Sequence, residues 1–170
     1  FLYESDAPLA ERRAAALSLD PVLLGELLGR NDVREILDPQ VIAGLQEQLQ
    51  YRAENRRLAG MEGAADLLRL LGPLSIEQLA ARLRDPNDDS APLDPAMARE
   101  HAESLVATRR AFTLRQNGAL AYAAIEDAGK LRDALGTPLP TGIPAAFLEP
   151  VADPIQDLIS RFARTHVPFT

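Results

Sequence analysis

Asn117 and Gly118 separate two short runs of strand-forming residues, at 112–116 and 119–125. Both central positions of a tight hairpin turn need a positive φ angle, which Asn and Gly adopt at little cost. The pair therefore predicts a two-stranded antiparallel hairpin. The rest of the chain shows helical rather than strand periodicity, so this hairpin restricts the fold more than any other feature.

Three helices are expected before the hairpin, over 64–71, 76–83 and 95–108. The second begins with Ser75-Ile76-Glu77-Gln78, which matches a capping box. The third follows Asp94-Pro95, where Asp can cap the first turn and Pro fits the first helical position. Helix, helix, longer helix and hairpin is the order of a winged helix-turn-helix.

The Asp-Pro dipeptide also predicts helix starts near residues 21, 39 and 154, whereas Asp85-Pro86 leads into a polar loop. The helix that starts at 39 is expected to reach 57, and its polar second half suggests that it projects or bridges between domains. After the hairpin, a helix over 126–135 is expected to end at Gly136.

We therefore expect an α+β fold that is mostly α, divided into four segments. These are a helical subdomain (1–60), a winged helix (61–135), a proline-rich linker (136–152) and the first helix of a further helical or winged-helix module (153–170). In the linker, Ile143, Phe147 and Leu148 are expected to pack onto a neighbour.

Composition excludes several classes of function. The sequence holds no cysteine, which excludes a disulfide scaffold, a thiol nucleophile and thiolate zinc sites. Its net charge of −7 has the wrong sign for a protein that depends mainly on attraction to phosphate. No run of about 20 apolar residues and no signal sequence is present, so we expect a cytoplasmic protein with no membrane partner.

No catalytic or cofactor site is expected in this chain. Gly129-Lys130 lacks the flanking residues of a phosphate-binding loop. His101 and His166 are far apart in the sequence and are better explained as packing or solvated groups than as metal ligands. The acidic pairs lack any identifiable pocket that would shift their pKa values.

The candidate functional surface is the third helix together with the hairpin. Helical geometry turns Ala98, Ala102, Leu105 and Val106 inward and leaves the opposite face exposed. The candidate nucleic-acid-binding residues are Arg99, Arg109, Arg110 and Arg115. In a winged helix such groups can contact DNA phosphates. Alternatively, they are solvated surface arginines beside Glu103, and the hairpin is purely structural.

Several segments, in the same order, resemble the large helicase-related (Lhr) family of bacterial superfamily 2, DEAD/DEAH-type helicases. They are Phe1-Leu2-Tyr3-Glu4, 6–17, 124–136, 140–144 and 153–166.

This resemblance implies a parent protein that is an ATP-dependent 3′-to-5′ DNA helicase associated with DNA repair. ATP and Mg²⁺ would bind in motor domains before Phe1, and a series of winged helices would follow. The chain would then be a non-catalytic junction that guides or grips DNA, with weak binding of its own, or that docks the C-terminal region onto the helicase core. The alternative is a protein-interaction or assembly scaffold without nucleic-acid contact. An acidic winged-helix transcription regulator is less favoured, because no ligand-binding or dimerisation element is evident.

Overall fold

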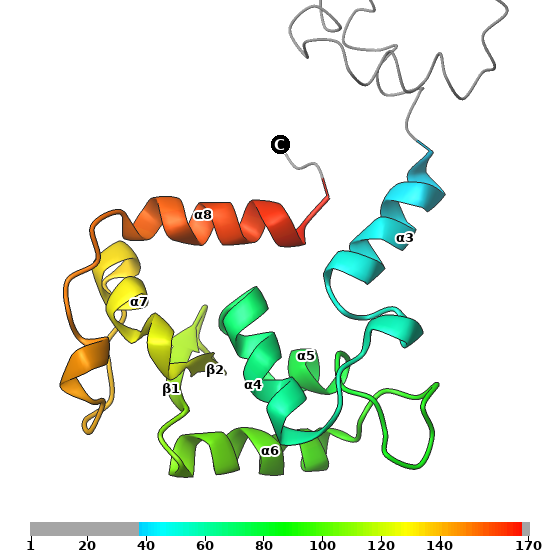
Figure 1. The fold of residues 1–170 in the computed structure, drawn as a ribbon, viewed down its shortest axis with the longest axis horizontal. Coiled ribbons are helices and arrows are strands. Elements are labelled where there is room, and N and C mark those ends of the chain that lie inside the picture. Colours follow the sequence, from blue (N-terminus) through cyan, green and yellow to red (C-terminus); the bar gives the residue numbers. More distant parts are fainter. Residues whose placement is uncertain (1–37, 168–170) are drawn as a thin grey trace, which may run out of the picture. The chain divides into compact units, whose positions relative to one another are not determined.

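The computed structural model of the chain describes residues 38–167 (Figure 1). The chain divides into two units, Phe1–Ile42 and Ala43–Thr170, and the contacts described below lie within the second. The helices expected before residue 38, including the one that follows Asp20-Pro21, lie outside the described residues.

Three helices form the first layer: α4 (Gly60–Leu71), α5 (Ile76–Ala80) and α6 (Pro95–Ala107). The predicted capping box of α5 is confirmed, because the Gln78 backbone N donates to Ser75 Oγ at 3.3 Å and the Ser75 backbone N donates to Gln78 Oε1 at 2.9 Å. The Asp94 carboxylate accepts the Ala96 backbone N–H at 2.7 Å, so it caps α6.

The three helices enclose a core of leucine and alanine side chains. Its fully buried members include Ala64, Leu67, Leu68, Leu79, Leu83, Ala98, Ala102 and Leu105. Alanines on α6 allow that helix to approach α4 and α5 closely. This explains how a chain without tryptophan builds a dense core.

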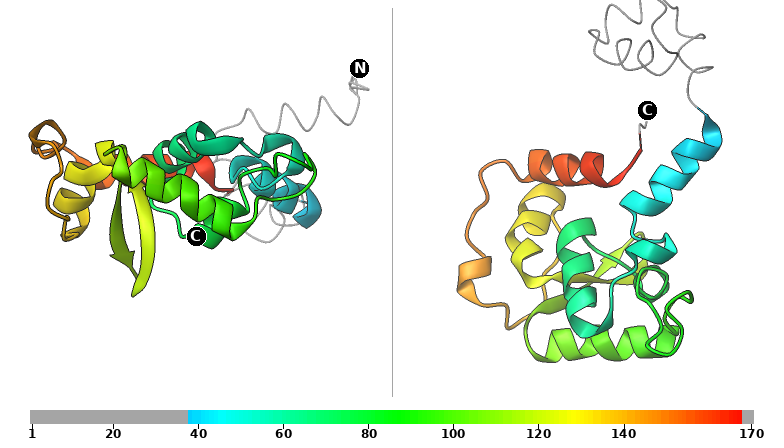
Figure 2. Two further views of the ribbon diagram at one scale, coloured as in Figure 1. Left: turned by 90° about the horizontal axis from the view of Figure 1, so that it is seen from below. Right: turned by 45° about the vertical axis from the view of Figure 1, so that its right-hand side comes forward.

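The predicted hairpin is confirmed as β1 (Ala111–Gln116) paired antiparallel with β2 (Ala119–Ala124). Asn117 and Gly118 have φ angles of 51° and 81°, as the turn requires. Leu74 forms two backbone hydrogen bonds with Tyr122, which adds a one-residue third strand. The tip of the hairpin projects beyond the helices (Figure 2).

Both faces of the hairpin are buried near its base, and alternate residues serve different cores. Ala111, Tyr122 and Ala124 pack into the helical core described above. Phe112, Leu114, Ala121 and Ala123 face a second core, which is closed by α7 (Ala128–Leu135), the segment that follows it and α8 (Pro154–Thr165). Ile143 and Phe147 contribute to this core as predicted, and Leu148 is half-buried. The short 3₁₀ helix η3 spans Ala145–Phe147.

The prediction of one helix over 39–57 is wrong. The helix α3 (Pro39–Leu49) ends eight residues earlier, and a 3₁₀ turn, η1, follows at Glu54–Arg56. Tyr51 has a φ angle of 58°, which interrupts the helix. The Gln50 side chain turns inward and bonds to groups distant in the sequence, so these contacts override the local helical preference of the polar segment.

Other helix bounds differ by smaller amounts. Helix α4 begins at Gly60 rather than 64. Helix α5 ends at Ala80, because the backbone of Arg82–Arg84 hydrogen-bonds instead to Leu58 and Leu93. The expected helix over 126–135 opens with the 3₁₀ turn η2 (Ile125–Asp127) and ends at Gly136, whose φ is 63°. The α+β, mostly α fold class is confirmed, and the four domain boundaries stay predictions.

Candidate nucleic-acid interface

Helix α6 presents the two faces that its sequence predicts. Ala98, Ala102 and Leu105 are buried and Val106 is half-buried, whereas Arg99 and Glu103 are exposed. The outward face therefore carries both signs of charge. A phosphate that approaches the middle of this helix would meet Glu103 as well as Arg99.

Arg109 lies at the sharp turn from α6 into β1. Its φ of 57° is unusual for a residue other than glycine. The Arg110 backbone N donates to Leu105 O at 2.8 Å, which closes the end of the helix around this residue. The Arg109 side chain is exposed, and within residues 38–167 no carboxylate forms an ion pair with it. The turn thus holds a solvated guanidinium between the helix and the wing.

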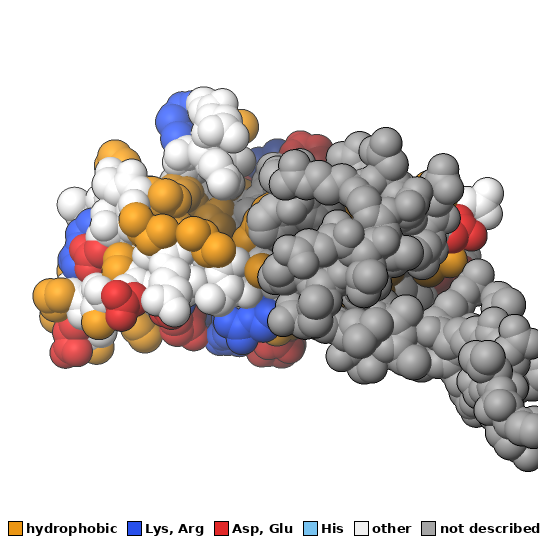
Figure 3. Space-filling view, turned by 90° about the horizontal axis from the view of Figure 1, so that it is seen from above, with side chains coloured by type: hydrophobic (Ala, Val, Ile, Leu, Met, Phe, Trp, Pro, Cys, Tyr) orange, Lys and Arg blue, Asp and Glu red, His pale blue; other side chains and the backbone are white. Residues whose placement is uncertain are grey.

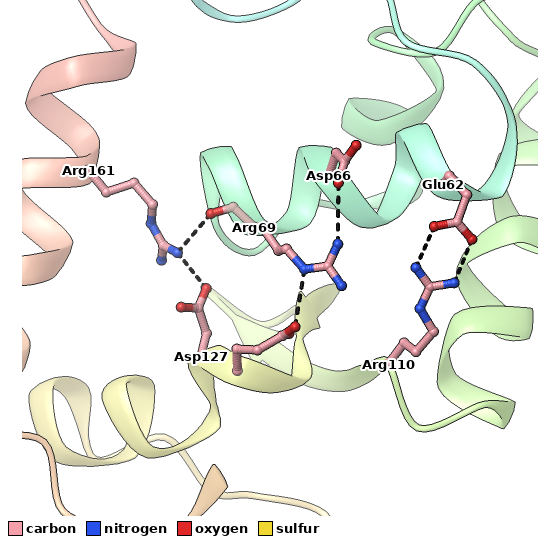
Figure 4. Close-up of polar contacts among 7 residues, drawn as sticks. Glu62, Asp66, Arg69, Arg110, Asp127 and Arg161 are labelled. Atoms are coloured by element: carbon pink, nitrogen blue, oxygen red, sulfur yellow. Dashed lines mark hydrogen bonds and ion pairs between the residues drawn. The ribbon is translucent and has the colours of Figure 1, made fainter.

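Arg110 occupies a different environment from Arg109. Its guanidinium donates to both carboxylate oxygens of Glu62 on α4, at 2.6 Å each (Figure 4). The hydrogen bonds from Arg110 are the main cause of a lowered pKa for Glu62, and the same bonds raise the pKa of Arg110. Glu62 therefore neutralises the positive charge of Arg110 within the molecule.

Arg115 lies near the tip of the wing, opposite Leu120 in the hairpin register. Its guanidinium donates to the Gly118 backbone oxygen at 3.0 Å, across the turn. A neutral carbonyl leaves the positive charge uncompensated, and the side chain is exposed. Arg115 therefore offers a positive group near the tip of the projecting wing.

Arg99 is exposed in the first half of α6 and lies within electrostatic range of Glu77 on α5. The pKa of Glu77 is lowered chiefly by its hydrogen bond from the Ser75 hydroxyl, and Arg99 makes a smaller contribution. At about 1.5 Å per helical residue, Arg99 lies about 12 Å along α6 from its last residue, Ala107, and Arg109 follows beyond that end. The four candidate arginines do not form one cluster.

Sequence reasoning missed a set of arginines that are paired within the molecule along α4 (Figure 4). Arg69 contacts Asp66 and Glu126 at 3.2 and 3.1 Å. Arg161 of α8 contacts the buried carboxylate of Asp127 at 2.5 Å. Asp66 is three residues from Arg69, but Glu126 lies 57 residues from Arg69 and Asp127 lies 34 residues from Arg161. Only the tertiary structure reveals these two distant pairings.

A second distinctive surface is the outer side of α8, where hydrophobic side chains gather (Figure 3). Ile155 and Ile159 are 56% and 58% exposed. Isoleucine side chains one turn apart on the same helix form an apolar stripe. Such a stripe is a candidate surface for contact with another protein segment.

Two further features of the described part bear on function. None of the helices between residues 38 and 167 combines the length and apolarity needed to span a membrane. Within the same residues, His, Asp and Glu side chains nowhere gather in threes as a metal site requires.

Comparison with known proteins agrees with this arrangement of helices and wing. Residues 35–150 match the family model described as "Large helicase-related protein, winged-helix domain". The whole chain is 51% identical to "Lhr helicase/ probable uracil glycosylase" of Mycolicibacterium smegmatis and 45% identical to "Lhr helicase/uracil glycosylase" of Escherichia coli. It covers 11% and 10% of those two proteins.

Proposed function

The chain belongs to the large helicase-related family, and from this premise we propose that it is a non-catalytic DNA-gripping segment of an ATP-dependent 3′-to-5′ DNA helicase. ATP and Mg²⁺ would bind in motor domains elsewhere in the longer protein. The names of the two relatives include uracil glycosylase, which supports a role of that longer protein in DNA repair.

The observation that carries the proposal is the contrast between two sets of arginines. Arg69, Arg110 and Arg161 have carboxylate partners on α4 or on η2. Arg109 and Arg115 have exposed guanidiniums with no ion pair among the described residues, and they lie at the two ends of β1. In winged helices that bind DNA, the wing can contact the DNA backbone beside the recognition helix. We therefore assign phosphate contact to Arg109 and Arg115, an auxiliary contact to Arg99, and a supporting role to Arg110.

The test is the salt dependence of duplex DNA binding by the 170-residue chain. We expect weak binding by the wild type, and about tenfold weaker binding by the R109A/R115A double variant at low salt. The slope of log affinity against log salt should become shallower by about one unit for each arginine that no longer neutralises a phosphate. Fluorescence anisotropy with a labelled duplex measures both quantities.

The matched control is the R56A/R164A double variant. It removes the same charge from two exposed arginines on η1 and α8, neither of which belongs to α6 or to the wing. We expect it to bind nearly as wild type does. Equal binding by R109A/R115A and wild type would exclude the α6–wing contact. A loss of affinity in the control as large as in R109A/R115A would show that total charge, and not the position of these arginines, determines binding.

The exposed stripe on α8 favours a second candidate, a docking scaffold that holds other parts of the helicase without touching DNA. An I155D/I159D variant would then lose association with the remainder of the protein, supplied as a separate chain, while duplex binding stays unchanged. The two candidates are thus separated by which variant affects which assay.

A further inference from the structure

A groove of about 590 Å³ lies between the wing, α5 and α8. Polar side chains from all three elements and from the end of α3 line it, together with an apolar wall of leucines. The polar members include Gln50, Gln78, Arg82, Gln116, Asn117 and His166. Its volume falls in the range of roughly 300–1,000 Å³ typical of small-ligand sites.

The lining of this groove contains no carboxylate, although acidic residues outnumber basic residues in the chain by 25 to 18. Each of four other hollows on the described surface has at least one carboxylate in its lining. Examples are Asp127 beside Arg161 and Asp89 beside Arg84. The groove is therefore a site where an anion meets no like charge in the wall.

Arg82 supplies an uncompensated positive charge at this site. The residue is only 4% exposed, and its guanidinium donates to the Gln78 backbone oxygen at 2.8 Å and to Gln50 Oε1 at 2.7 Å. Both acceptors are neutral, and the Arg82 Nε–H has no partner within the described residues. Glu47 and Arg52 act on Arg82 with opposite signs and pair with each other at 2.6 Å. A buried cation without a counter-ion is costly, so a bound anion would stabilise it.

The other walls suit a flat ring. Leu120 of the wing is 47% exposed and lines the groove. On the α8 side of the groove, Phe162 and His166 stack with ring centroids 3.6 Å apart. Aromatic side chains stack on nucleobases without sequence preference, and a flat apolar base also buries surface against leucine side chains. The amides of Gln116 and Asn117 lie at the wing edge of the same groove and can donate to phosphate oxygens.

We propose that this groove binds a phosphate ester that carries a flat ring, namely a nucleotide, either free or as one unit of a single strand. The groove shares the wing with the α6–wing contact proposed above, but none of the four arginines of that contact lines it. The ring packs between the leucine wall and the α8 side, while Arg82 and the amides attract the phosphate.

The test adds carboxylates to the groove of the 170-residue chain without disturbing its fold. Glu serves the capping box as well as Gln does, so Gln78→Glu retains the start of α5. Gln116 is exposed, which makes Gln116→Glu tolerable. We expect the double variant to bind a labelled short oligothymidylate about tenfold more weakly than wild type, because like charges repel over these distances. Its melting temperature should not fall, since a carboxylate near Arg82 offers the missing counter-charge.

The control is the Gln40→Glu/Gln156→Glu variant, which adds the same charge at exposed positions in the first turns of α3 and α8. We expect it to bind as wild type does. Equal binding by the groove variant and wild type would overturn the proposal, as would an equal loss in the control.

Competition identifies the source of the ligand. Displacement of the oligothymidylate by thymidine monophosphate at low concentration indicates a free-nucleotide site, and displacement only by unlabelled strand indicates a strand site. Displacement by inorganic phosphate as effective as by the nucleotide would exclude recognition of the ring. The R109A/R115A variant should retain binding of the oligothymidylate. A failure of the groove proposal is therefore distinguishable from a failure of the proposed duplex contact.

Discussion

Arg110 and Glu62 form the best-defined ion pair on the surface of the winged helix. If Arg110 is responsible for the lowered pKa of Glu62, Arg110→Ala should return that pKa towards its ordinary value of 4.5. Because the folded-state pKa is lowered, the pair contributes stability above pH 4.5 and loses it as pH falls through the folded-state value. Carboxyl chemical shifts recorded by NMR as a function of pH measure the change.

Asp88 provides the internal control for this titration. Its pKa is also lowered, but by hydrogen bonds from the side chain and backbone of Ser90. In the Arg110→Ala protein the titration of Asp88 should not move. If the titration curve of Glu62 also stayed unchanged, a group other than Arg110 would be the cause of its lowered pKa.

The sequence predicts which side chains of α6 are buried, but not which partners Arg110 and Arg82 have. Helical periodicity correctly turns Ala98, Ala102 and Leu105 inward, because a 3.6-residue repeat requires no knowledge of the partner. The pairing of Arg110 depends on Glu62, 48 residues earlier, and the burial of Arg82 depends on Gln50, 32 residues earlier. Neither pairing has a local sequence signal. The position of Arg82 within the apolar segment 79–83 is the one sequence feature that indicates its burial.

Gly129 shows how one residue governs the packing of a whole segment. A Cβ at this position of α7 would lie 2.9 Å from the Glu149 backbone oxygen and 3.1 Å from that of Phe147. Both atoms belong to the backbone that crosses α7, so they cannot move aside as a flexible side chain could. We expect Gly129→Ala to lower the free energy of unfolding by about 1–3 kcal/mol, measured by urea denaturation.

Gly44 on α3 is the matched comparison, because no atom lies within 4 Å of its hypothetical Cβ. Gly44→Ala should raise the free energy of unfolding by about 0.5–1 kcal/mol through helix propensity alone. If both substitutions stabilised the protein, the close approach of the 147–149 backbone to α7 would be wrong.

The elements that were predicted correctly are those whose boundaries depend on residues close together in the sequence. The Asn117-Gly118 turn and the Ser75 capping box each depend on residues within four positions, and both are confirmed. The end of α3 was missed because Gln50 bonds to Arg82 and to the Thr165 backbone oxygen, which lies 115 residues later. The carboxylate-free groove was missed for the same reason, since its lining comes from α4, α5, both strands of the wing, α7 and α8.

Helix α8 connects the two cores of the compact unit. Leu158 packs into the second core, while Arg161 bonds to Asp127 and to the Arg69 backbone oxygen of α4. At its C-terminal end, the Thr165 oxygen and the Val167 backbone N bond to the side chains of Gln50 and Gln46. These contacts link α8 to the winged helix along its length, so we expect residues 43–167 to unfold cooperatively.

Arg161→Ala tests this linkage. The Arg161 and Asp127 side chains are 15% and 7% exposed, so the substitution leaves a buried carboxylate with only Lys130, at 3.7 Å, as a cationic partner among the described residues. Loss of one member of a buried ion pair costs about 3 kcal/mol, whereas Arg164→Ala, at an exposed position on the same helix, should stay within about 0.5 kcal/mol of wild type. Urea denaturation followed by circular dichroism should show one transition in all three proteins, shifted to lower urea only in Arg161→Ala. A wild type that unfolds in two separate steps, or an Arg161→Ala protein as stable as wild type, would mean that α8 is not an integral part of this unit.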